Sequence, residues 1–267
     1  RCSRIYVDEN GQYLTKGPEY ETVWAHGTDC GISDLDAIAR MDRMDDDFGI
    51  DTIETGATIA VAMEAGILPF GDAPAAIELL SEVGKGSPLG RLVASGAEVL
   101  GKTYGVRHIP TVKGQSMPAY DPRAVLGIGV TYATSPMGAD HTAGYAVTAN
   151  ILGVGGKVDP LKPEGQVELS RNLQIATAAI DAAGLCLFTA FAVLDDPSAL
   201  EGICEMLAGW YGREYASADF LELGKRTLLC ERRFNAAAGF TAADDRLPDF
   251  FKKEKLSPHN VVFTVPD

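Results

Sequence analysis

The sequence has 267 residues, of which 46% are hydrophobic and 22% are charged, a composition typical of one large or two ordinary folded domains. A net charge of −14 disfavours nucleic acid and anionic membranes as partners, because both carry negative charge. No stretch offers the roughly 18 consecutive apolar residues that a membrane span needs, since residues 175–193, which come closest, contain Asp181.

The pattern of apolar residues predicts a mainly α protein. Residues 1–24 are expected to be extended or irregular, whereas from residue 33 apolar side chains recur at helical spacing up to Gly49. A short strand is expected again at 261–265. The other segments predicted to be helices are 53–65, 73–83, 87–103, 122–133, 141–151, 164–183, 197–210 and 217–237.

The Gly- and Pro-containing segment around 106–122 is the best candidate for a domain boundary. It divides the chain into a first helical domain, residues 1–112 with the extended N-terminal segment, and a second helical domain, residues 113–267. A ligand lying between the two halves would meet both of them, and cofactors often bind where domains meet.

One short pattern occurs twice, once in each predicted domain. Residues 46–51 and 181–186 both follow Asp-x-x-Gly-aliphatic-(Cys or Asp) at the end of a helical segment. Gly at this place predicts a left-handed residue that ends the helix. A single Asp near a helix end usually has only a local role, but the repetition favours a shared ligand, from which a carboxylate can accept two parallel N–H bonds. Asp47 replaces Asp46 in this role only if the register shifts.

Further segments accompany the two motifs in a fixed order: Glu-Tyr-Glu at 19–21, the stretch 113–123, Tyr-Ala-Thr-Ser at 132–135, His141, and the stretch 231–241 with Glu-Arg-Arg-Phe-Asn and Gly-Phe-Thr. Together these features resemble the tungsten-containing aldehyde ferredoxin oxidoreductase family, over nearly the whole chain. The resemblance implies two helical domains that correspond to the C-terminal domains of that family. In the family a β-rich domain precedes them.

The resemblance also implies an activity and its cofactors. The whole enzyme would oxidise aldehydes to carboxylic acids at tungsten, or molybdenum, held by two pterins, and would pass electrons through a [4Fe–4S] cluster to ferredoxin. The residues that match the family's pterin-contacting motifs are Asp46, Gly49, Asp51, Asp181, Gly184 and Leu185.

Two cysteines match cluster ligands of the family, Cys186 directly after the second motif and Cys2 near the N-terminus. The alternative for Cys186 is a buried cysteine that only packs. A cubane needs four ligands, and the family's other two would precede Arg1. The chain is therefore expected to be part of a longer one, and by itself to hold neither the cluster nor the metal-pterin centre.

Two side chains match the family's active-site glutamate and histidine. Glu21 fits better than Glu19 by its spacing to Asp51, although both would share one face of an extended segment, so side-chain alternation does not choose between them. His141 matches the histidine, whereas a lone His more often bonds only locally. A carboxylic acid and an imidazole can move a proton as an aldehyde is hydrated or oxidised.

Cysteine usage favours the reducing cytoplasm, because five cysteines at irregular spacings do not fit a secreted disulfide framework. Cys30, Cys204 and Cys230 are expected to be core residues. The alternative to an enzyme is a helical binding or assembly module that derives from the same family and holds no metal.

Overall fold

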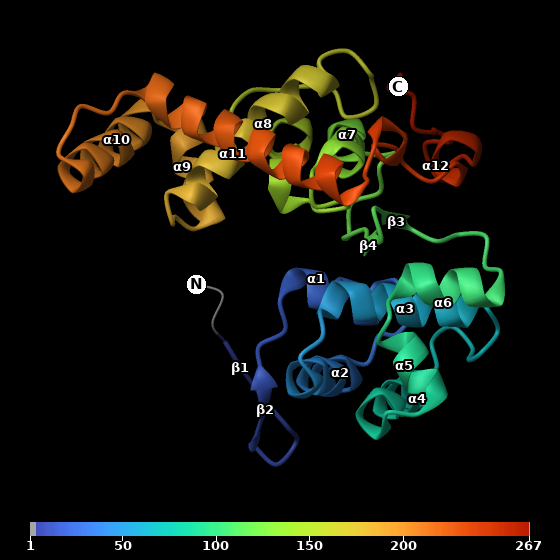
Figure 1. Ribbon diagram of the computed structural model, residues 1–267. Coiled ribbons are helices and arrows are strands. Elements are labelled where there is room, and N and C mark those ends of the chain that lie inside the picture. Colours follow the sequence, from blue (N-terminus) through green and yellow to red (C-terminus); the bar gives the residue numbers. More distant parts are fainter. Residues whose placement is uncertain (1–3, 267) are drawn as a thin grey trace. The chain divides into compact units, whose positions relative to one another are not determined.

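The structure is a computed structural model, and it describes residues 4–266. Two compact units divide the chain, one ending at Ala119 and the other beginning at Tyr120. Helices make up most of each unit, and the described residues contain two small two-stranded sheets (Figure 1). The predicted mainly α fold is therefore confirmed. Within residues 4–266 no helix is both long and apolar enough to cross a membrane.

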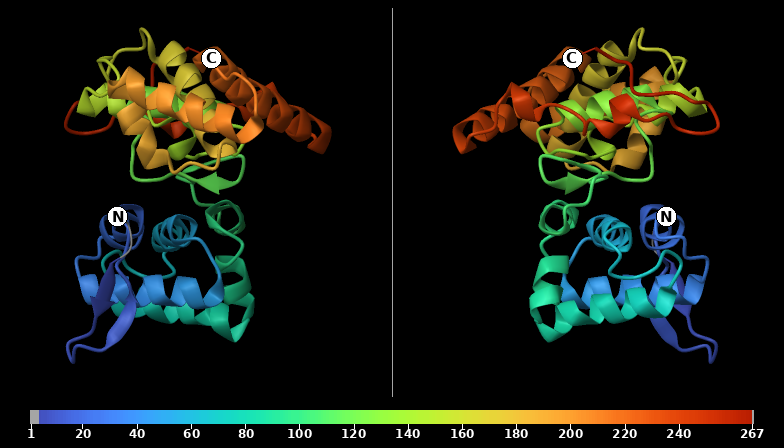
Figure 2. Two further views of the ribbon diagram at one scale, coloured as in Figure 1. Left: turned by 90° about the vertical axis from the view of Figure 1, so that its left-hand side faces the viewer. Right: turned by 90° about the vertical axis from the view of Figure 1, so that its right-hand side faces the viewer.

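The first unit begins with an antiparallel hairpin and continues as helices. β1 (Ile5–Val7) pairs with β2 (Tyr13–Lys16), and β2 packs against α2 (Leu35–Phe48) (Figure 2). The other elements of this unit are α1 (Tyr20–Val23), the π-helix η1 (Trp24–Thr28), α3 (Thr52–Glu64), α4 (Ala73–Lys85), α5 (Pro88–Val93), α6 (Ala97–Tyr104), and the short hairpin of β3 (Thr111–Val112) and β4 (Gln115–Ser116).

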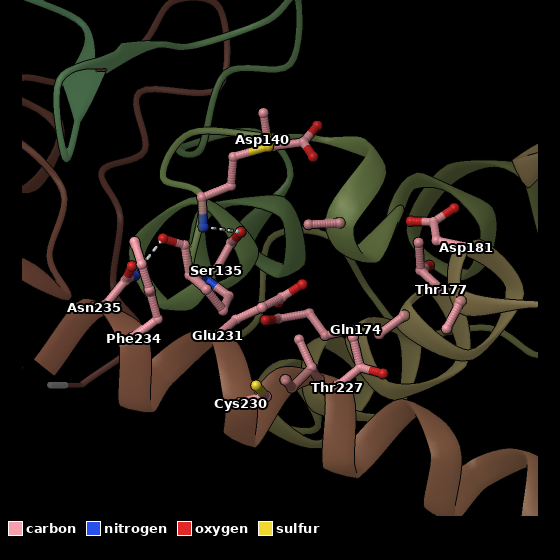
Figure 3. Close-up of a pocket in the computed structure, with 16 residues that line it drawn as sticks. Ser135, Asp140, Gln174, Thr177, Asp181, Thr227, Cys230, Glu231, Phe234 and Asn235 are labelled. Atoms are coloured by element: carbon pink, nitrogen blue, oxygen red, sulfur yellow. Dashed lines mark hydrogen bonds between the residues drawn. The ribbon is translucent and has the colours of Figure 1, made fainter. Parts of the chain in front are cut away.

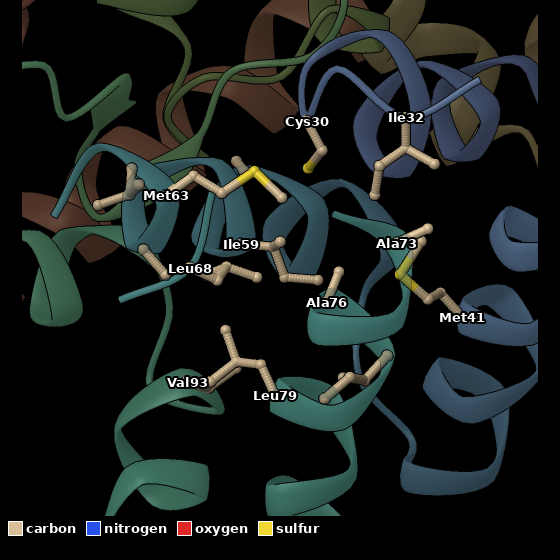
Figure 4. Close-up of a cluster of buried hydrophobic side chains, with 14 of the residues drawn as sticks. Cys30, Ile32, Met41, Ile59, Met63, Leu68, Ala73, Ala76, Leu79 and Val93 are labelled. Atoms are coloured by element: carbon tan, nitrogen blue, oxygen red, sulfur yellow. The ribbon is translucent and has the colours of Figure 1, made fainter. Parts of the chain in front are cut away.

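The core of the first unit lies between the apolar faces of α2, α3 and α4. Met41, Ile59 and Leu80 are fully buried in one cluster, to which Cys30 also belongs, as the sequence predicts (Figure 4). Burying a side chain of this size contributes about 1.5–3 kcal/mol. This core fixes the last turn of α2, in which the first Asp-x-x-Gly motif begins, and the start of α3, which directly follows the motif.

The second unit is built around two long helices that lie side by side, α8 (Gln166–Ala182) and α11 (Ser217–Ala238) (Figure 1). They approach closely at Gly224, where a Cβ would overlap the carbonyl oxygen of Ile175. The remaining elements are α7 (Leu126–Thr134), η2 (Thr142–Gly144), η3 (Thr148–Leu152), η4 (Leu187–Thr189), α9 (Ala190–Asp195), α10 (Pro197–Tyr211), η5 (Ala242–Asp244) and α12 (Phe250–Lys253).

Residues 20–28 are helical, so the prediction of an extended segment through residue 24 is wrong there. α1 continues into η1, in which the Asp29 N–H donates to the Trp24 carbonyl at 3.0 Å. Packing of η1 on α3 stabilises this short helix, a contact that the local sequence does not reveal. Because Glu19 precedes α1 and Glu21 lies within it, the two do not share one face of a strand.

Two predicted helices are interrupted, each at an identifiable residue. The segment 87–103 divides into α5 and α6 because Gly96 has a positive φ of 89°, and the Ala97 N–H then donates to the side chain of Glu54 at 2.9 Å. The segment 141–151 forms only η2 and η3, since the Asp140 carboxylate binds the N–H and hydroxyl of Thr142 at its start.

Three further differences concern the ends of the second unit and its short helices. α7 begins at Leu126 instead of residue 122. Among the described residues of 261–265, an isolated bridge from Val261 to Leu256 replaces the expected strand. The short helices α9 and α12 are not anticipated by the apolar pattern.

Candidate functional site

The two Asp-x-x-Gly motifs adopt the same backbone conformation, although they share few side chains. Gly49 and Gly184 are both left-handed, with φ of 69° and 73°. Each glycine N–H donates to the carbonyl of the motif's aspartate, Gly49 to Asp46 at 3.3 Å and Gly184 to Asp181 at 2.9 Å. The repeat seen in the sequence is therefore also a repeat in structure, with an aspartate in the last turn of a helix.

The last residue of each motif also occupies an equivalent position. Asp51 and Cys186 both have φ of −74°, with ψ of 135° and 137°, and each is the residue immediately before the next helix. Asp51 caps α3, because its carboxylate accepts the Glu54 N–H at 2.8 Å. Cys186 precedes η4 and its side chain is exposed.

Asp46 lies at the surface beside a lysine. Its carboxylate, 47% exposed, binds Lys16 Nζ at 2.9 Å, and the same ammonium binds the fully buried Asp42 at 3.0 Å. The Thr15 hydroxyl also donates to Asp42, at 2.7 Å. Burial acts to lower the pKa of Lys16, but the hydrogen bonds to Asp46 and Asp42 outweigh it and raise the pKa. The carboxylate predicted to face a pterin is thus already paired with a cation.

Glu21 is held within the first unit. Its Oε2 accepts the backbone N–H of Ala119 at 2.9 Å, so a residue at the end of the unit fixes the side chain. The carboxylate lies on α1, one turn before the π-helix η1. π-Helical turns often accompany functional sites.

A cavity of about 700 Å³ opens in the second unit between α8, α11 and the loop around residues 135–143 (Figure 3). This volume is in the range that binds small molecules and cofactors. Asp181 and Gln174 contribute from α8 and Glu231 from α11, while Asp140 contributes from the loop. The cavity therefore includes one predicted cofactor ligand, Asp181, and the residue that precedes His141.

The carboxylates of this cavity affect one another. Burial raises the pKa of Asp181, and the charge of Asp140 raises it further. Burial likewise raises the pKa of Glu231, with a further increase from Asp181. Charged carboxylates in such surroundings are stabilised by a ligand that donates N–H groups or carries positive charge.

His141 lies in an aromatic cluster beside the cavity. Its ring centroid is 5.5 Å from that of Tyr120 and 5.8 Å from that of Tyr145, and the two tyrosine hydroxyls are hydrogen-bonded at 2.7 Å. Burial lowers the pKa of His141, while Asp140 acts in the opposite direction. Burial therefore favours the neutral imidazole, which is the form that can accept a proton.

The cysteines divide into three groups. Cys30 and Cys204 are buried as predicted, but Cys230 is exposed on α11 and lines the cavity, so its prediction as a core residue is wrong. Cys2 lies outside the described residues. Within residues 4–266 no three His, Cys, Asp or Glu side chains form a group that could hold a metal ion.

Glu231 has no role predicted from the sequence, although it begins the Glu-Arg-Arg-Phe-Asn segment. The spacing of Glu231, Phe234 and Asn235 on one helical face was the available signal, and all three line the cavity. Asn235 also anchors the adjacent loop, because its amide donates to the Pro136 carbonyl at 2.6 Å (Figure 3).

Comparison with known proteins gives the family. The sequence model of the protein family described as "Aldehyde ferredoxin oxidoreductase, domains 2 & 3" matches residues 1–263. The chain belongs to the aldehyde ferredoxin oxidoreductase family. The tungsten-containing aldehyde ferredoxin oxidoreductase of Pyrococcus furiosus is 38% identical over 91% of this chain and 42% of its own length.

Other relatives agree. The tungsten-containing aldehyde ferredoxin oxidoreductase of Thermococcus kodakarensis is 37% identical over 91% of this chain and 42% of its own length. That of Pyrococcus horikoshii is 34% identical over 96% of this chain and 44% of its own length. An aliphatic sulfonate oxidoreductase, WOR-like subunit, of Pyrococcus furiosus is 28% identical over 55% of the chain and 28% of its own length. The chain thus spans less than half the length of the aldehyde ferredoxin oxidoreductases that it matches.

Proposed function

We propose that this chain forms the two helical domains of an enzyme that oxidises aldehydes to carboxylic acids at a tungsten bis-pterin centre. The observation that carries the proposal is the repeated motif, which presents an aspartate with the same backbone geometry in each unit. When bound, the metal-pterin centre supplies the two-electron oxidation with water as the oxygen source, and a [4Fe–4S] cluster relays the electrons to ferredoxin.

Asp181 fits a pterin edge. It lines a cavity of suitable volume, and burial raises its pKa, so two N–H donors from a ligand would stabilise its charged form. Asp46 is half exposed and therefore accessible, but a pterin must share it with Lys16. Gly49 and Gly184 fix the direction in which the two motifs present their aspartates, with Asp51 and Leu185 next to them.

Glu21 and His141 are proposed to handle protons. Conversion of an aldehyde and water to a carboxylic acid releases two electrons, which the metal-pterin centre would accept, and two protons, so a group that can accept a proton is required. His141 supplies it, because burial lowers the pKa of the imidazole. Glu21 is anchored through the Ala119 N–H and can orient the water that adds to the carbonyl carbon.

The cluster fits this chain only in part. Cys186 has an exposed side chain and belongs to the same motif as Asp181. This position suits a cysteine that binds a cluster next to the pterin that Asp181 contacts. Cys2 remains a predicted ligand outside the described residues, and the other two thiolates would come from outside this chain. A second candidate function, a helical module that holds no metal, is favoured by the Lys16–Asp46 ion pair, which neutralises a proposed pterin ligand.

One experiment separates the two functions. The complete gene product, purified without oxygen from cells grown with tungstate, is expected to reduce ferredoxin when an aldehyde is added, and to do so faster than with an aliphatic sulfonate. His141→Ala should lower kcat by about 100-fold or more while tungsten content stays unchanged. A protein with neither tungsten nor aldehyde-dependent reduction would identify the non-catalytic module.

A further inference from the structure

Two side-chain hydrogen bonds join the continuous α1–η1 segment, which carries Glu21, to the two residues that flank the first Asp-x-x-Gly motif. The first links the hydroxyls of Thr22 and Thr52 at 2.8 Å. Thr22 directly follows Glu21, and Thr52 directly follows Asp51. This bond therefore connects the neighbours of a proposed proton-handling residue and a proposed pterin-contacting residue.

The second bond lies one helical turn further along. His26 Nε2 and Asp45 Oδ2 are 2.6 Å apart, and both side chains are fully buried. Asp45 directly precedes Asp46, and its carbonyl accepts the N–H of Ile50 at 3.0 Å, so it forms part of the turn that ends α2. Thr22 and His26 are four residues apart and lie on the same face of α1 and η1, which allows both bonds to reach the residues that flank the motif.

The backbone around these bonds has little freedom to shift. A Cβ on Gly56 of α3 would lie 2.5 Å from the backbone carbonyl carbon of Ala25, so α3 and η1 pack backbone against backbone. The buried thiol of Cys30 donates to the Ala25 carbonyl at 3.2 Å and also contacts the Gly56 carbonyl at 3.5 Å. The segment 22–26 is thus fixed against α3 as well as against the end of α2.

We infer that Thr22 and His26 are positioning residues, which hold Glu21 in a defined place relative to the Asp46–Asp51 motif. This inference rests on the proposed function, because it gives the pair a role in catalysis beyond stabilising the first unit. Displacing a catalytic group by about 1 Å can lower the rate by about 100-fold. Two short side-chain bonds at the ends of one helical turn are suited to prevent such a displacement.

The test uses the complete gene product and a reporter that does not depend on activity. The Ala119 amide donates to Glu21, so its hydrogen exchange reports whether Glu21 keeps its place. Thr22→Val removes the link to Thr52 with almost no change of shape, and it remains informative if His26→Leu does not fold. His26→Gln keeps a side chain that can hydrogen-bond to Asp45. Thr58→Val is the matched control, because Thr58 is equally buried but its hydroxyl donates only to a backbone carbonyl of its own helix, that of Glu54.

Thr22→Val and His26→Leu are expected to speed exchange of the Ala119 amide by about tenfold or more, and to lower kcat by about tenfold with KM changed less than about twofold. His26→Gln should stay within about threefold of the wild type in both measurements. The inference is overturned if Thr22→Val leaves Ala119 exchange unchanged, or if Thr58→Val speeds it to the same degree. Should the wild-type protein oxidise no aldehyde, the exchange data still decide the positioning, while the proposed function fails by itself.

Discussion

Three consecutive aspartates near the end of α2 show how strongly a side chain's surroundings decide what it can do. Asp45 is fully buried against His26, and burial raises its pKa even though the hydrogen bond to His26 acts in the opposite direction. Asp46 is half exposed beside Lys16, and Asp47 pairs with Arg43 at the surface. Asp46 and Asp47 are both exposed, at 47% and 51% of their side chains, and Asp46 stays the predicted ligand because it begins the Asp-x-x-Gly pattern.

Asp29 gives a test of burial at a single residue. Burial raises the pKa of its carboxyl to about 6, against about 3.9 in an unfolded chain. The folded protein therefore binds this proton more tightly, and its free energy of unfolding should fall as pH rises from about 4 to about 6. Asp29→Asn should remove this part of the fall, as measured by urea unfolding at several pH values.

Asp249→Asn provides a control of opposite sign. The hydrogen bond from Lys253 lowers the pKa of Asp249, so its charged form adds stability that is lost as pH falls through that pKa. Asp249→Asn should therefore weaken the loss of unfolding free energy at acid pH. It should leave unchanged the fall in unfolding free energy between about pH 4 and about pH 6. If the Asp29→Asn protein still shows the whole fall in unfolding free energy over this pH range, the Asp29 carboxyl is not the cause of that fall.

The site residues that the sequence reveals are those defined by local chemistry. Gly49 and Gly184 are recognisable because a left-handed helix end follows from a short pattern. The bond between His26 and Asp45 could not be predicted, since it joins residues 19 positions apart through the packing of η1 on α2. The helical spacing of Glu231, Phe234 and Asn235 can be read from the sequence, but the cavity that they line also needs α8 and the loop around residues 135–143, which only the packing brings together.

At the scale of elements, apolar periodicity locates the long helices well and their interruptions poorly. α2, α3 and α8 begin and end within a few residues of the predicted places, because each has its own apolar face and end signals. The break at Gly96 depends on the distant Glu54 side chain, which binds the first N–H of α6. The break therefore depends on a tertiary contact as well as on the local glycine.

The packing of α8 on α11 gives a prediction at this scale. Gly224→Ala places a methyl group into the carbonyl oxygen of Ile175, so the two helices must separate, and the free energy of unfolding should fall by about 1–3 kcal/mol or more. Gly202→Ala is the matched control, because a Cβ there meets no atom within 4 Å. It should raise stability by about 0.5–1 kcal/mol through helix propensity. Equal effects of the two substitutions in urea unfolding would contradict this description of the interface.

At the scale of the whole molecule, each unit has its own buried cluster, one around Met41 and Ile59 and one around Ile180 and Phe220. The 267 residues expressed alone are therefore expected to fold. They should contain neither tungsten nor a [4Fe–4S] cluster, since Cys2 and Cys186 are two predicted cluster ligands where a cubane needs four. Circular dichroism and elemental analysis check both statements, and a brown protein with stoichiometric iron would contradict the second.

The central claim is that one aspartate in each unit binds a pterin, and the tungsten content of the complete gene product tests it most directly. Asp196→Ala is the control, because this aspartate only caps α10. Each of Asp46→Ala and Asp181→Ala removes a charged acceptor worth about 1.5–3 kcal/mol. Our account predicts that each single variant loses tungsten, that the double variant loses most of it, and that the control keeps a wild-type ratio of tungsten to protein. A double variant with the wild-type ratio would contradict the account.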